Sequence, residues 1–260
     1  MIKAVMLDLD GTLLTDDHII SDTNKEVLKK LIEKGVKVYL VTGRSFDAMK
    51  QYHQELGLDT PAICYNGAKI VYPNGEFNEY PIRDNELKTL IDIAHETETH
   101  LNIYQHEVWY CENTENEETK TYIHISGLTP TQINFNDLKE LFSTKILYIA
   151  DHEKLLEVER EIKSRLGNKV FTTFSKPFFL EVLYGDVNKG STMEKIMKKE
   201  GIDLADVIAF GDGLNDLEML QMAGIGVAME KSFPELLKVA DEVTGSNNES
   251  GVGEFLKRYL

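Results

Sequence analysis

The sequence predicts an α/β fold in which a parallel sheet is covered by helices and the chain of the core is interrupted by an inserted α+β domain. In the first 80 residues, short apolar segments alternate with amphipathic ones in the order strand, helix, strand, helix, strand, which is typical of parallel sheets. From about residue 83 to 185 the pattern becomes mixed and rich in Tyr and Phe, and it then returns to α/β. We therefore expect a core of residues 1–82 and 186–260 and an inserted domain of residues 83–185.

The N-terminal part is expected to begin with a buried strand over residues 4–7, followed by a helix. Ser21 or Asp22 can cap the start of this helix, and Gly35 ends it. A second strand, a second helix closed by Gly57, a third strand and a hairpin complete this part. The hairpin is expected to turn at Asn74–Gly75.

The insert is expected to contain two helices and several strands. The helices are predicted over residues 86–98 and 153–166, and residues 112–120 form an acidic stretch that we expect to be solvated. The strands are predicted within residues 100–105, 107–112, 145–151, 169–175 and 178–184. Beyond the insert, a helix over residues 191–201 leads to a strand that ends at Gly211.

Composition excludes several classes of partner. The formal net charge of the chain is −16, which argues against binding to a nucleic-acid backbone or to an anionic membrane surface. No apolar run approaches the roughly 18 residues that span a bilayer, and Asp8 and Asp10 interrupt the apolar N-terminus, unlike a signal peptide. Cys64 and Cys111 lack metal-type spacing and suit reduced thiols. We expect a cytoplasmic protein.

Polar residues follow the predicted strands of the core. Because ligands bind at the carboxyl ends of strands in open parallel sheets, we expect these side chains to gather at one edge. They are Asp8 and Asp10, then Thr42, Gly43 and Arg44, then Asp212, Asn215 and Asp216, with Lys189 close to the start of a helix.

Asp8 and Asp10 lie on the same side of an extended chain and repel each other unless a cation sits between them. Carboxylates gathered without Cys or His favour a hard cation, so we expect Mg²⁺ there with Asp212 as a third protein ligand. Mg²⁺ held by few carboxylates usually also binds a phosphate oxygen.

A phosphate can be held by the groups around this cation. The Thr42 hydroxyl and the Gly43 amide lie close to the start of a helix, and Lys189 can neutralise the remaining charge. Asp8 could then attack phosphorus and form an aspartyl-phosphate. Asp10 is placed to protonate the leaving oxygen and later to activate water.

These residues resemble the four motifs of the haloacid dehalogenase superfamily. The motifs are Asp8-Leu9-Asp10-Gly11-Thr12, Thr42-Gly43-Arg44, Lys189, and the hexapeptide from Gly211 to Asp216. By length and position, the insert resembles the cap of the Cof-type (subclass IIB) sugar-phosphate phosphatases. Asn66-Gly67-Ala68 is also similar to a segment of that subfamily.

The resemblance implies a Rossmann-like, doubly wound core with a cap domain that sets substrate specificity. It implies that Asp8 is the nucleophile and Asp10 the acid and base. It also implies Mg²⁺ on Asp8, the backbone carbonyl of Asp10 and Asp212, with Asp216 in support. Phosphate contacts are implied for Leu9, Thr42, Gly43, Lys189 and Asn215. The activity would be Mg²⁺-dependent hydrolysis of phosphate monoesters of small metabolites through an aspartyl-phosphate.

Some roles remain open from the sequence. Arg44 could bind substrate or pair with a surface acid, and His18 is expected to be a surface or packing residue. One alternative function is a phosphotransferase that resembles phosphomannomutase and passes the phosphoryl group to a second sugar hydroxyl. Another is a sensor that stays phosphorylated on Asp8. The presence of Asp10 argues against the sensor, because a lasting phospho-aspartate gains nothing from a neighbouring water activator.

Overall fold

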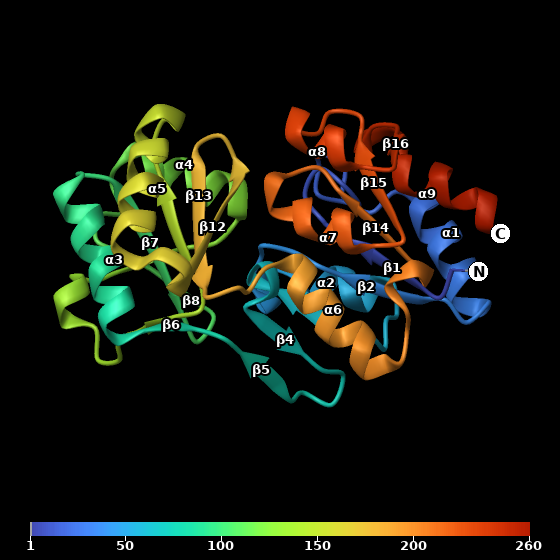
Figure 1. Ribbon diagram of the computed structural model, residues 1–260, viewed down its shortest axis with the longest axis horizontal. Helices are drawn as coiled ribbons and strands as arrows, with labels where there is room; N and C mark the ends of the chain where they lie inside the picture. Colours follow the sequence, from blue (N-terminus) through green and yellow to red (C-terminus); the bar gives the residue numbers. More distant parts are fainter. Residues whose placement is uncertain (1) are drawn as a thin grey trace. The chain divides into compact units, whose positions relative to one another are not determined.

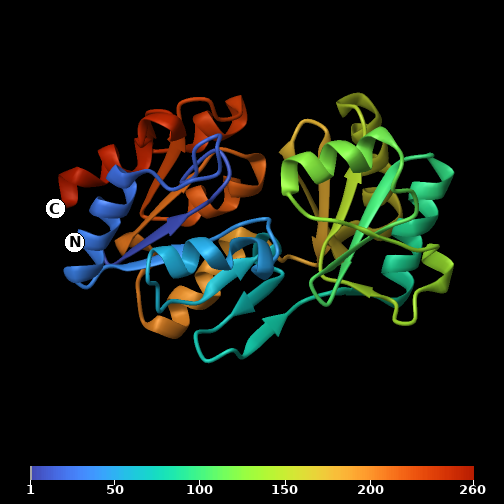
Figure 2. The ribbon, with the colours of Figure 1, turned by 180° about the vertical axis from the view of Figure 1, so that it is seen from behind.

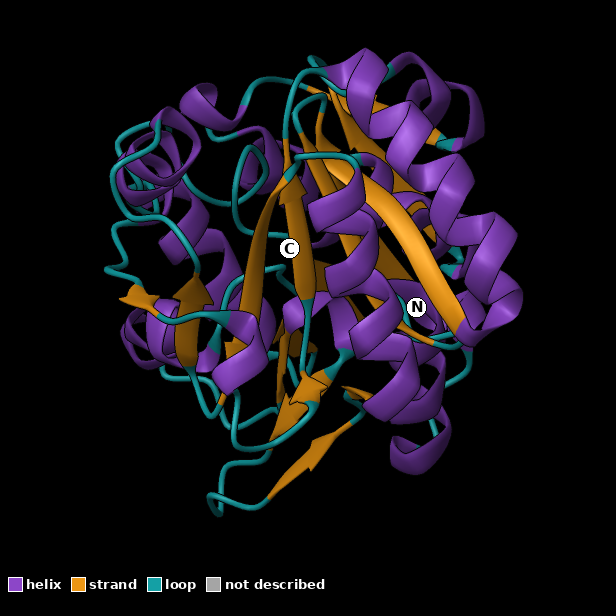
Figure 3. Ribbon diagram, turned by 90° about the vertical axis from the view of Figure 1, so that its left-hand side faces the viewer, coloured by secondary structure: helices purple, strands orange, loops and turns teal. Residues whose placement is uncertain are grey.

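A computed structural model describes residues 2–260 and divides them into two compact units (Figure 1). The first unit contains the residues up to Asn78 together with Asn188–Leu260, and the second contains Glu79–Val187. Helices and strands both occur throughout the described residues (Figure 3), and the strands of each unit form one large and one small sheet. The predicted fold class, an α/β core with an inserted α+β domain, is confirmed.

The first unit is built on a five-stranded parallel sheet with the order β16-β15-β14-β1-β2. Its strands are β1 (Ala4–Leu7), β2 (Lys37–Leu40), β14 (Val207–Gly211), β15 (Ile225–Met229) and β16 (Glu242–Thr244). The four residues of β1 are all buried, and they pair in register with β14 on one side and β2 on the other. An entirely apolar strand is expected at such a central position, since helices cover both faces of the sheet.

The helices of this unit cover both faces of the parallel sheet. They are α1 (Asp22–Glu33), α2 (Phe46–Glu55), α6 (Lys189–Glu200), α7 (Leu217–Met222), α8 (Pro234–Val239) and α9 (Gly251–Leu256). The crossover from β1 to β2 through α1 and the crossover from β14 to β15 through α7 run in opposite directions along the sheet. Because such crossovers are right-handed, α1 and α7 cover opposite faces. Helix α9 packs against α1, and α6 packs against α7.

The third strand departs from a simple continuation of the parallel sheet. β3 (Ala62–Cys64) joins β2 through a parallel bridge between Val41 and Ile63, but it pairs antiparallel with β4 (Lys69–Val71). β5 (Phe77–Glu79) follows β4 in this small sheet, and Gly75, with a φ of +85°, lies in the turn between them. The chain reverses directly after β3 through a short turn, residues 65–67.

The second unit contains a six-stranded sheet with the order β12-β13-β11-β7-β8-β9. Its strands are β7 (His100–Gln105), β8 (Val108–Cys111), β9 (Thr131–Gln132), β11 (Ile146–Ile149), β12 (Val170–Lys176) and β13 (Phe179–Tyr184). Two short strands, β6 (Ile82–Arg83) and β10 (Phe142–Ser143), pair separately and antiparallel. The pairing of β6 draws Ile82 into this unit, which therefore starts earlier than residue 83.

Helices lie on both faces of the second sheet. α3 (Asp84–Glu96) and α5 (His152–Leu166) pack together on one face, where the Tyr148 hydroxyl donates to the carbonyl of Leu90 over 2.6 Å. α4 (Glu117–Ser126) covers part of the other face, where the Tyr104 and Tyr122 hydroxyls are 2.6 Å apart (Figure 2).

Helix α4 begins within the acidic stretch of residues 112–120, where no helix was predicted from the sequence, although only Thr119 of that stretch is buried. Asn116 caps the helix by accepting from the N–H of Thr119, and Thr119 and Tyr122 are buried. Thr119 and Tyr122 are the buried residues of this ten-residue helix, so its apolar pattern in the sequence is weak. Within residues 2–260, no helix has both the length and the apolar character needed to cross a membrane.

Candidate active site

Asp8 and Lys189 form a buried ion pair at the carboxyl end of β1. Asp8 follows the last residue of the strand and is 5% exposed, and Lys189 is the first residue of α6 and is fully buried. The Lys189 ammonium lies 2.6 Å from Asp8 Oδ1 and 2.5 Å from Asp216 Oδ1. One cation therefore contacts carboxylates from two different strand ends.

The start of α6 is fixed by local contacts that hold Lys189 in place. Asn188 and Ser191 form a capping box, in which Asn188 Oδ1 accepts from the Ser191 N–H over 2.7 Å. Gly190 lies directly against α7, since a Cβ there would come within 2.6 Å of the Glu218 carbonyl carbon. Glycine at this position allows the two helices to approach closely.

Asp216 organises the loop after β14. Its Oδ2 accepts from the N–H groups of Asp212 and Gly213, each over 3.0 Å, while its Oδ1 contacts Lys189. Gly211 leaves room for this carboxylate, because a Cβ there would lie 2.4 Å from Asp216 Cβ. The loop thus turns back onto the sheet and holds Asp212 at the strand end.

Asp212 is held from the other side by the loop after β1. The Thr12 hydroxyl donates to Asp212 Oδ1 over 3.0 Å, a contact that the sequence reasoning did not assign. Gly11 has a φ of +81°, and a Cβ there would lie 2.4 Å from Asp212 Oδ2. The signal available in the sequence was the position of Thr12, a hydroxyl residue that directly follows Asp8, Asp10 and Gly11.

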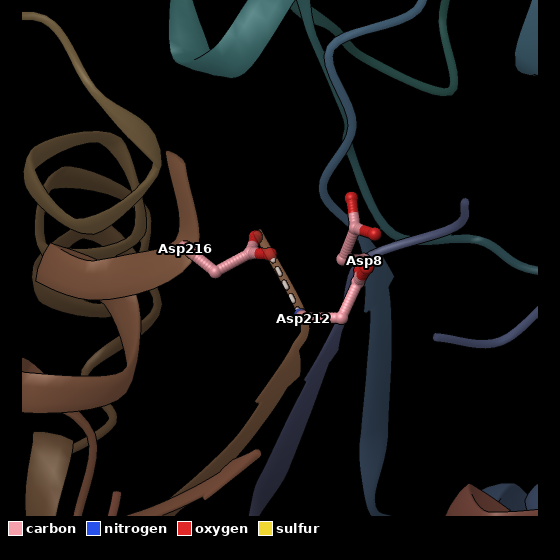
Figure 4. Close-up of side chains that lie close together, drawn as sticks. All are labelled: Asp8, Asp212 and Asp216. Atoms are coloured by element: carbon pink, nitrogen blue, oxygen red, sulfur yellow. Dashed lines mark hydrogen bonds between the residues drawn. The ribbon is translucent and has the colours of Figure 1, made fainter. Parts of the chain in front are cut away.

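Asp8, Asp212 and Asp216 come together as a carboxylate cluster. Each offers an oxygen atom within 4.8 Å of the others (Figure 4). Fully ionised, the three carboxylates would carry two more charges than the one ammonium of Lys189 balances. Burial raises the pKa of Asp8 well above its usual range, since the attraction of Lys189 does not outweigh burial and the repulsion of the other carboxylates.

The neighbouring ionisable groups respond to the same charge excess. Burial, and then repulsion by Asp216, raises the pKa of Asp212 to about 7. Burial opposes the charge of Lys189, but Asp216 and Asp8 outweigh it and raise its pKa. An all-oxygen donor set with excess negative charge fits a divalent cation of the Mg²⁺ or Ca²⁺ type.

The side chain of Asp10 lies apart from this cluster. Arg44 Nε donates to Asp10 Oδ2 over 2.7 Å and Arg44 Nη2 donates to Oδ1 over 2.5 Å. The Asp10 carboxylate therefore pairs with Arg44 in this structure, and the expectation that one cation lies between Asp8 and Asp10 stays a prediction. β1 ends at Leu7, so the alternation of an extended strand does not continue to Asp10. The implied role of its backbone carbonyl is a separate matter and stays a prediction.

Arg44 is surrounded by further groups from the first unit. Its Nη2 lies 3.2 Å from His18 Nδ1, and its guanidinium lies 5.6 Å from the ring centre of Tyr52. The Tyr52 hydroxyl also donates to the His18 carbonyl over 3.0 Å. Arg44 was expected either to bind substrate or to pair with a surface acid. It does pair with an acid, but that acid is Asp10, a residue of the candidate site. His18 is half-exposed, as a surface residue should be.

The residues predicted to contact phosphate lie at the same strand ends. Leu9, Thr42 and Asn215 are buried, and Thr42 Oγ1 accepts from the Arg44 N–H over 3.1 Å. Asn215 Nδ2 donates to Asn66 Oδ1 over 3.0 Å, so Asn66 joins the set without having been assigned a role. The tripeptide Asn66-Gly67-Ala68 was noted in the sequence, but nothing in the sequence indicated that Asn66 contacts Asn215.

Comparisons with known proteins agree with this arrangement. Residues 5–256 match the family model described as haloacid dehalogenase-like hydrolase. Putative phosphatase YxeH of Bacillus subtilis (strain 168) is 32% identical over 100% of this chain and 99% of its own length. The 5-amino-6-(5-phospho-D-ribitylamino)uracil phosphatase YitU of the same organism is 30% identical over 98% of this chain and 97% of its own.

A solved structure extends the comparison to three dimensions. A haloacid dehalogenase-like hydrolase from Bacteroides thetaiotaomicron is 29% identical, with a TM-score of 0.86 over 100% of both chains. The chain therefore belongs to the haloacid dehalogenase-like hydrolases, as a phosphatase.

Proposed function

We propose that this phosphatase is Mg²⁺-dependent and hydrolyses phosphate monoesters through an aspartyl-phosphate on Asp8. The observation that carries the proposal is the buried Asp8 carboxylate, which shares Lys189 with Asp216 beside Asp212. Asp8 lies at the carboxyl end of the central strand β1, and ligands of such sheets bind at the carboxyl ends of the strands.

Asp8, Asp212 and the backbone carbonyl of Asp10 would hold the Mg²⁺ ion, with Asp216 in support. Asp216 supports the site because both its oxygens already accept hydrogen bonds from the chain. When bound, Mg²⁺ would offset the excess negative charge and screen the nucleophile from an anionic phosphate.

In the first half-reaction a carboxylate oxygen of Asp8 attacks phosphorus, and the bond from phosphorus to the ester oxygen breaks. Lys189 supports this step because its ammonium, 2.6 Å from Asp8 Oδ1, reduces the repulsion between carboxylate and phosphate. The Thr42 hydroxyl, the Asn215 amide and the N–H groups of Leu9 and Gly43 would hold the phosphate oxygens.

Asp10 handles the protons of both half-reactions. It donates a proton to the leaving oxygen and then takes one from the water that attacks phosphorus, which releases phosphate and restores Asp8. To do so, it must leave the Arg44 pair and enter the first step as the neutral carboxylic acid. We propose that a substrate oxygen takes over Arg44 at that moment, which would give this residue a role in substrate binding.

The substrate is proposed to be a small phosphorylated metabolite selected by the inserted unit, residues 83–185 in the sequence-based division. Sugar phosphates are one class, as the resemblance to Cof-type phosphatases implies. YitU is named for a phosphorylated ribitylaminouracil, so phosphorylated compounds with a polyol chain form a second class worth testing.

The test is phosphate release across a panel of phosphorylated metabolites, with Mg²⁺ and with EDTA, for the wild-type protein and Asp8→Asn. We expect release that needs both Mg²⁺ and Asp8. Asp10→Asn should slow release by about 10²–10⁴-fold, the usual contribution of a positioned acid or base. Full activity of Asp8→Asn would overturn the nucleophile.

The same panel separates the alternative functions. Isomerisation of a hexose phosphate without free phosphate would favour a phosphotransferase. A phospho-Asp8 that persists for hours without turnover would favour a sensor.

A further inference from the structure

The turn after β3 joins two loops of the candidate site that come from opposite sides of β1. We propose that Asn66, in this turn, is a positioning residue that orients the Asn215 amide and the Gly43 backbone toward the phosphate. The proposal rests on the proposed phosphate site, and Asn66 itself need not touch the substrate.

The Asn66 side chain contacts both loops. Its Oδ1 accepts from Asn215 Nδ2 over 3.0 Å, and both residues are buried. The same oxygen packs against Gly43, where a Cβ would lie 3.1 Å away from it. One buried amide oxygen therefore sets the spacing between two groups that are expected to hold the same phosphate.

The positions of these loops in the sheet explain why such a link is useful. Gly43 follows β2 and Asn215 follows β14, and these strands flank β1 on its two sides. Asp8 follows β1 between them. Two donors on separate loops can move independently unless a third group fixes their separation, and lost orientation lowers the affinity for the ligand they share.

The backbone of the turn adds two further constraints. The N–H of Asn66 donates to the Thr42 carbonyl over 2.9 Å, and the N–H of Tyr65 donates to the Arg44 carbonyl over 3.0 Å. On its other side, Gly67 lies against the cap of α6, since a Cβ there would come within 2.6 Å of the Asn188 carbonyl oxygen. The turn thus touches the segments that carry Thr42, Asn215 and Lys189.

Asparagine suits this position for two reasons. The residue has a φ of +54° and a ψ of 33°, in the left-handed region that asparagine tolerates better than most residues. Glycine would also adopt this backbone, but it has no acceptor for Asn215. The hydrogen bond uses one proton of the planar Asn215 amide and thereby fixes the direction of its second proton, which is the one proposed to reach the phosphate.

A double-mutant cycle on phosphate binding tests the proposal. The dissociation constant of inorganic phosphate is measured by calorimetry in Mg²⁺ for the wild-type protein, Asn66→Gly, Asn215→Ala and the double variant. The kcat and KM for p-nitrophenyl phosphate are measured alongside. Ala68→Gly is the matched control, since it loosens the same turn without removing an amide.

We expect Asn66→Gly to weaken phosphate binding about tenfold, the size of one hydrogen bond to a charged ligand. In the Asn215→Ala background, the same change should weaken binding clearly less, because only the contact of Asn66 with Gly43 is then left to lose. Ala68→Gly should bind phosphate as the wild-type protein does. Unchanged binding in Asn66→Gly, or an equal loss in both backgrounds, would overturn the proposal.

Thermal unfolding accompanies every variant. If Asn66→Gly does not fold, Asn66→Asp becomes the deciding variant, because its carboxylate still accepts from Asn215. Asn66→Asp should then fold, and failure of both variants would reduce Asn66 to a structural residue and refute the proposal. Failure of the phosphatase proposal itself is seen separately, since it would leave wild-type p-nitrophenyl phosphate unhydrolysed.

Discussion

The two units of the molecule both bury charged side chains, but they balance them differently. At the strand ends of the first unit, three carboxylates surround the single ammonium of Lys189. In the sheet of the second unit, Lys145 pairs with Glu181 at 3.1 Å, and the Ser175 hydroxyl donates to Glu181 over 2.5 Å. The first arrangement is negative in excess, and the second is neutral.

This difference separates a binding site from a structural ion pair. A buried charge is tolerated when it has a partner, and breaking such a pair leaves an uncompensated charge. The Lys145–Glu181 pair is complete within the chain. We propose that a bound cation completes the cluster of Asp8, Asp212 and Asp216, so we expect substitution of Asp8, which organises no loop, to affect activity more than stability.

The largest effect should come from Asp8→Asn. Loss of the nucleophile is expected to lower kcat by at least about 10⁴-fold, as in other enzymes that form covalent intermediates. The metal-free variant should nevertheless unfold at the same or a higher temperature, since one of three repelling carboxylates becomes neutral. Phosphate release and thermal unfolding in EDTA measure the two effects, with the exposed Asp47→Asn as control.

A clear loss of stability in Asp8→Asn would break the comparison. It would mean that Asp8 and Lys189 form a structural pair of the same kind as the one in the second unit. Retained activity would remove the nucleophile from the proposed mechanism in addition.

The second effect should be a loss of stability in Glu181→Leu. Leaving the Lys145 ammonium buried without its partner is expected to cost about 3–5 kcal/mol in the free energy of unfolding. The double variant with Lys145→Met should recover most of that loss, because two apolar side chains can replace a buried ion pair. Denaturant unfolding of the two variants measures both values. An equal loss in the single and double variants would show that packing, and not charge, is decisive.

The sequence could predict most of the carboxylate cluster because the fold class fixes where strand ends meet. Once residues 4–7 and 207–211 are recognised as parallel strands, Asp8 and Asp212 must follow their carboxyl ends at one edge of the sheet. The sheet order and the close approach of Lys189 and Asp216 then follow from packing that local patterns do not encode.

Other features depend on contacts between segments that are distant in sequence. The pairing of Asp10 with Arg44 could not be predicted because β1 stops at Leu7 and the chain turns before Asp10. Asn66 contacts Asn215 across 149 positions in sequence. Helix α4 was missed because its few buried residues, Thr119 and Tyr122, give a weak apolar period within an acidic segment.

The smallest effect concerns His100, a half-buried histidine of the second unit. His100 Nε2 lies 2.8 Å from Asn102 Oδ1, and its Nδ1 lies 3.0 Å from Asn116 Nδ2, the residue that caps α4. These partners assign the neutral tautomer that carries its proton on Nε2. Burial lowers the pKa of His100, although the Asn102 bond and the charge of Glu118 oppose the shift.

A lowered histidine pKa means that the unfolded chain binds the proton more tightly than the folded protein does. The contribution of His100 to stability should therefore be present above about pH 6.5 and be lost as the pH falls through the pKa of the folded state. Protonation would also put an N–H on Nδ1 against the Asn116 amide and weaken the cap of α4.

In His100→Gln the free energy of unfolding should fall less between about pH 7 and pH 5 than in the wild-type protein. The exposed His106→Gln should leave the wild-type profile unchanged. If His100→Gln and the wild-type protein lose stability in parallel over this range, a group other than His100 controls the acid sensitivity. The contacts of His100 with Asn102 and Asn116 then have no part in it.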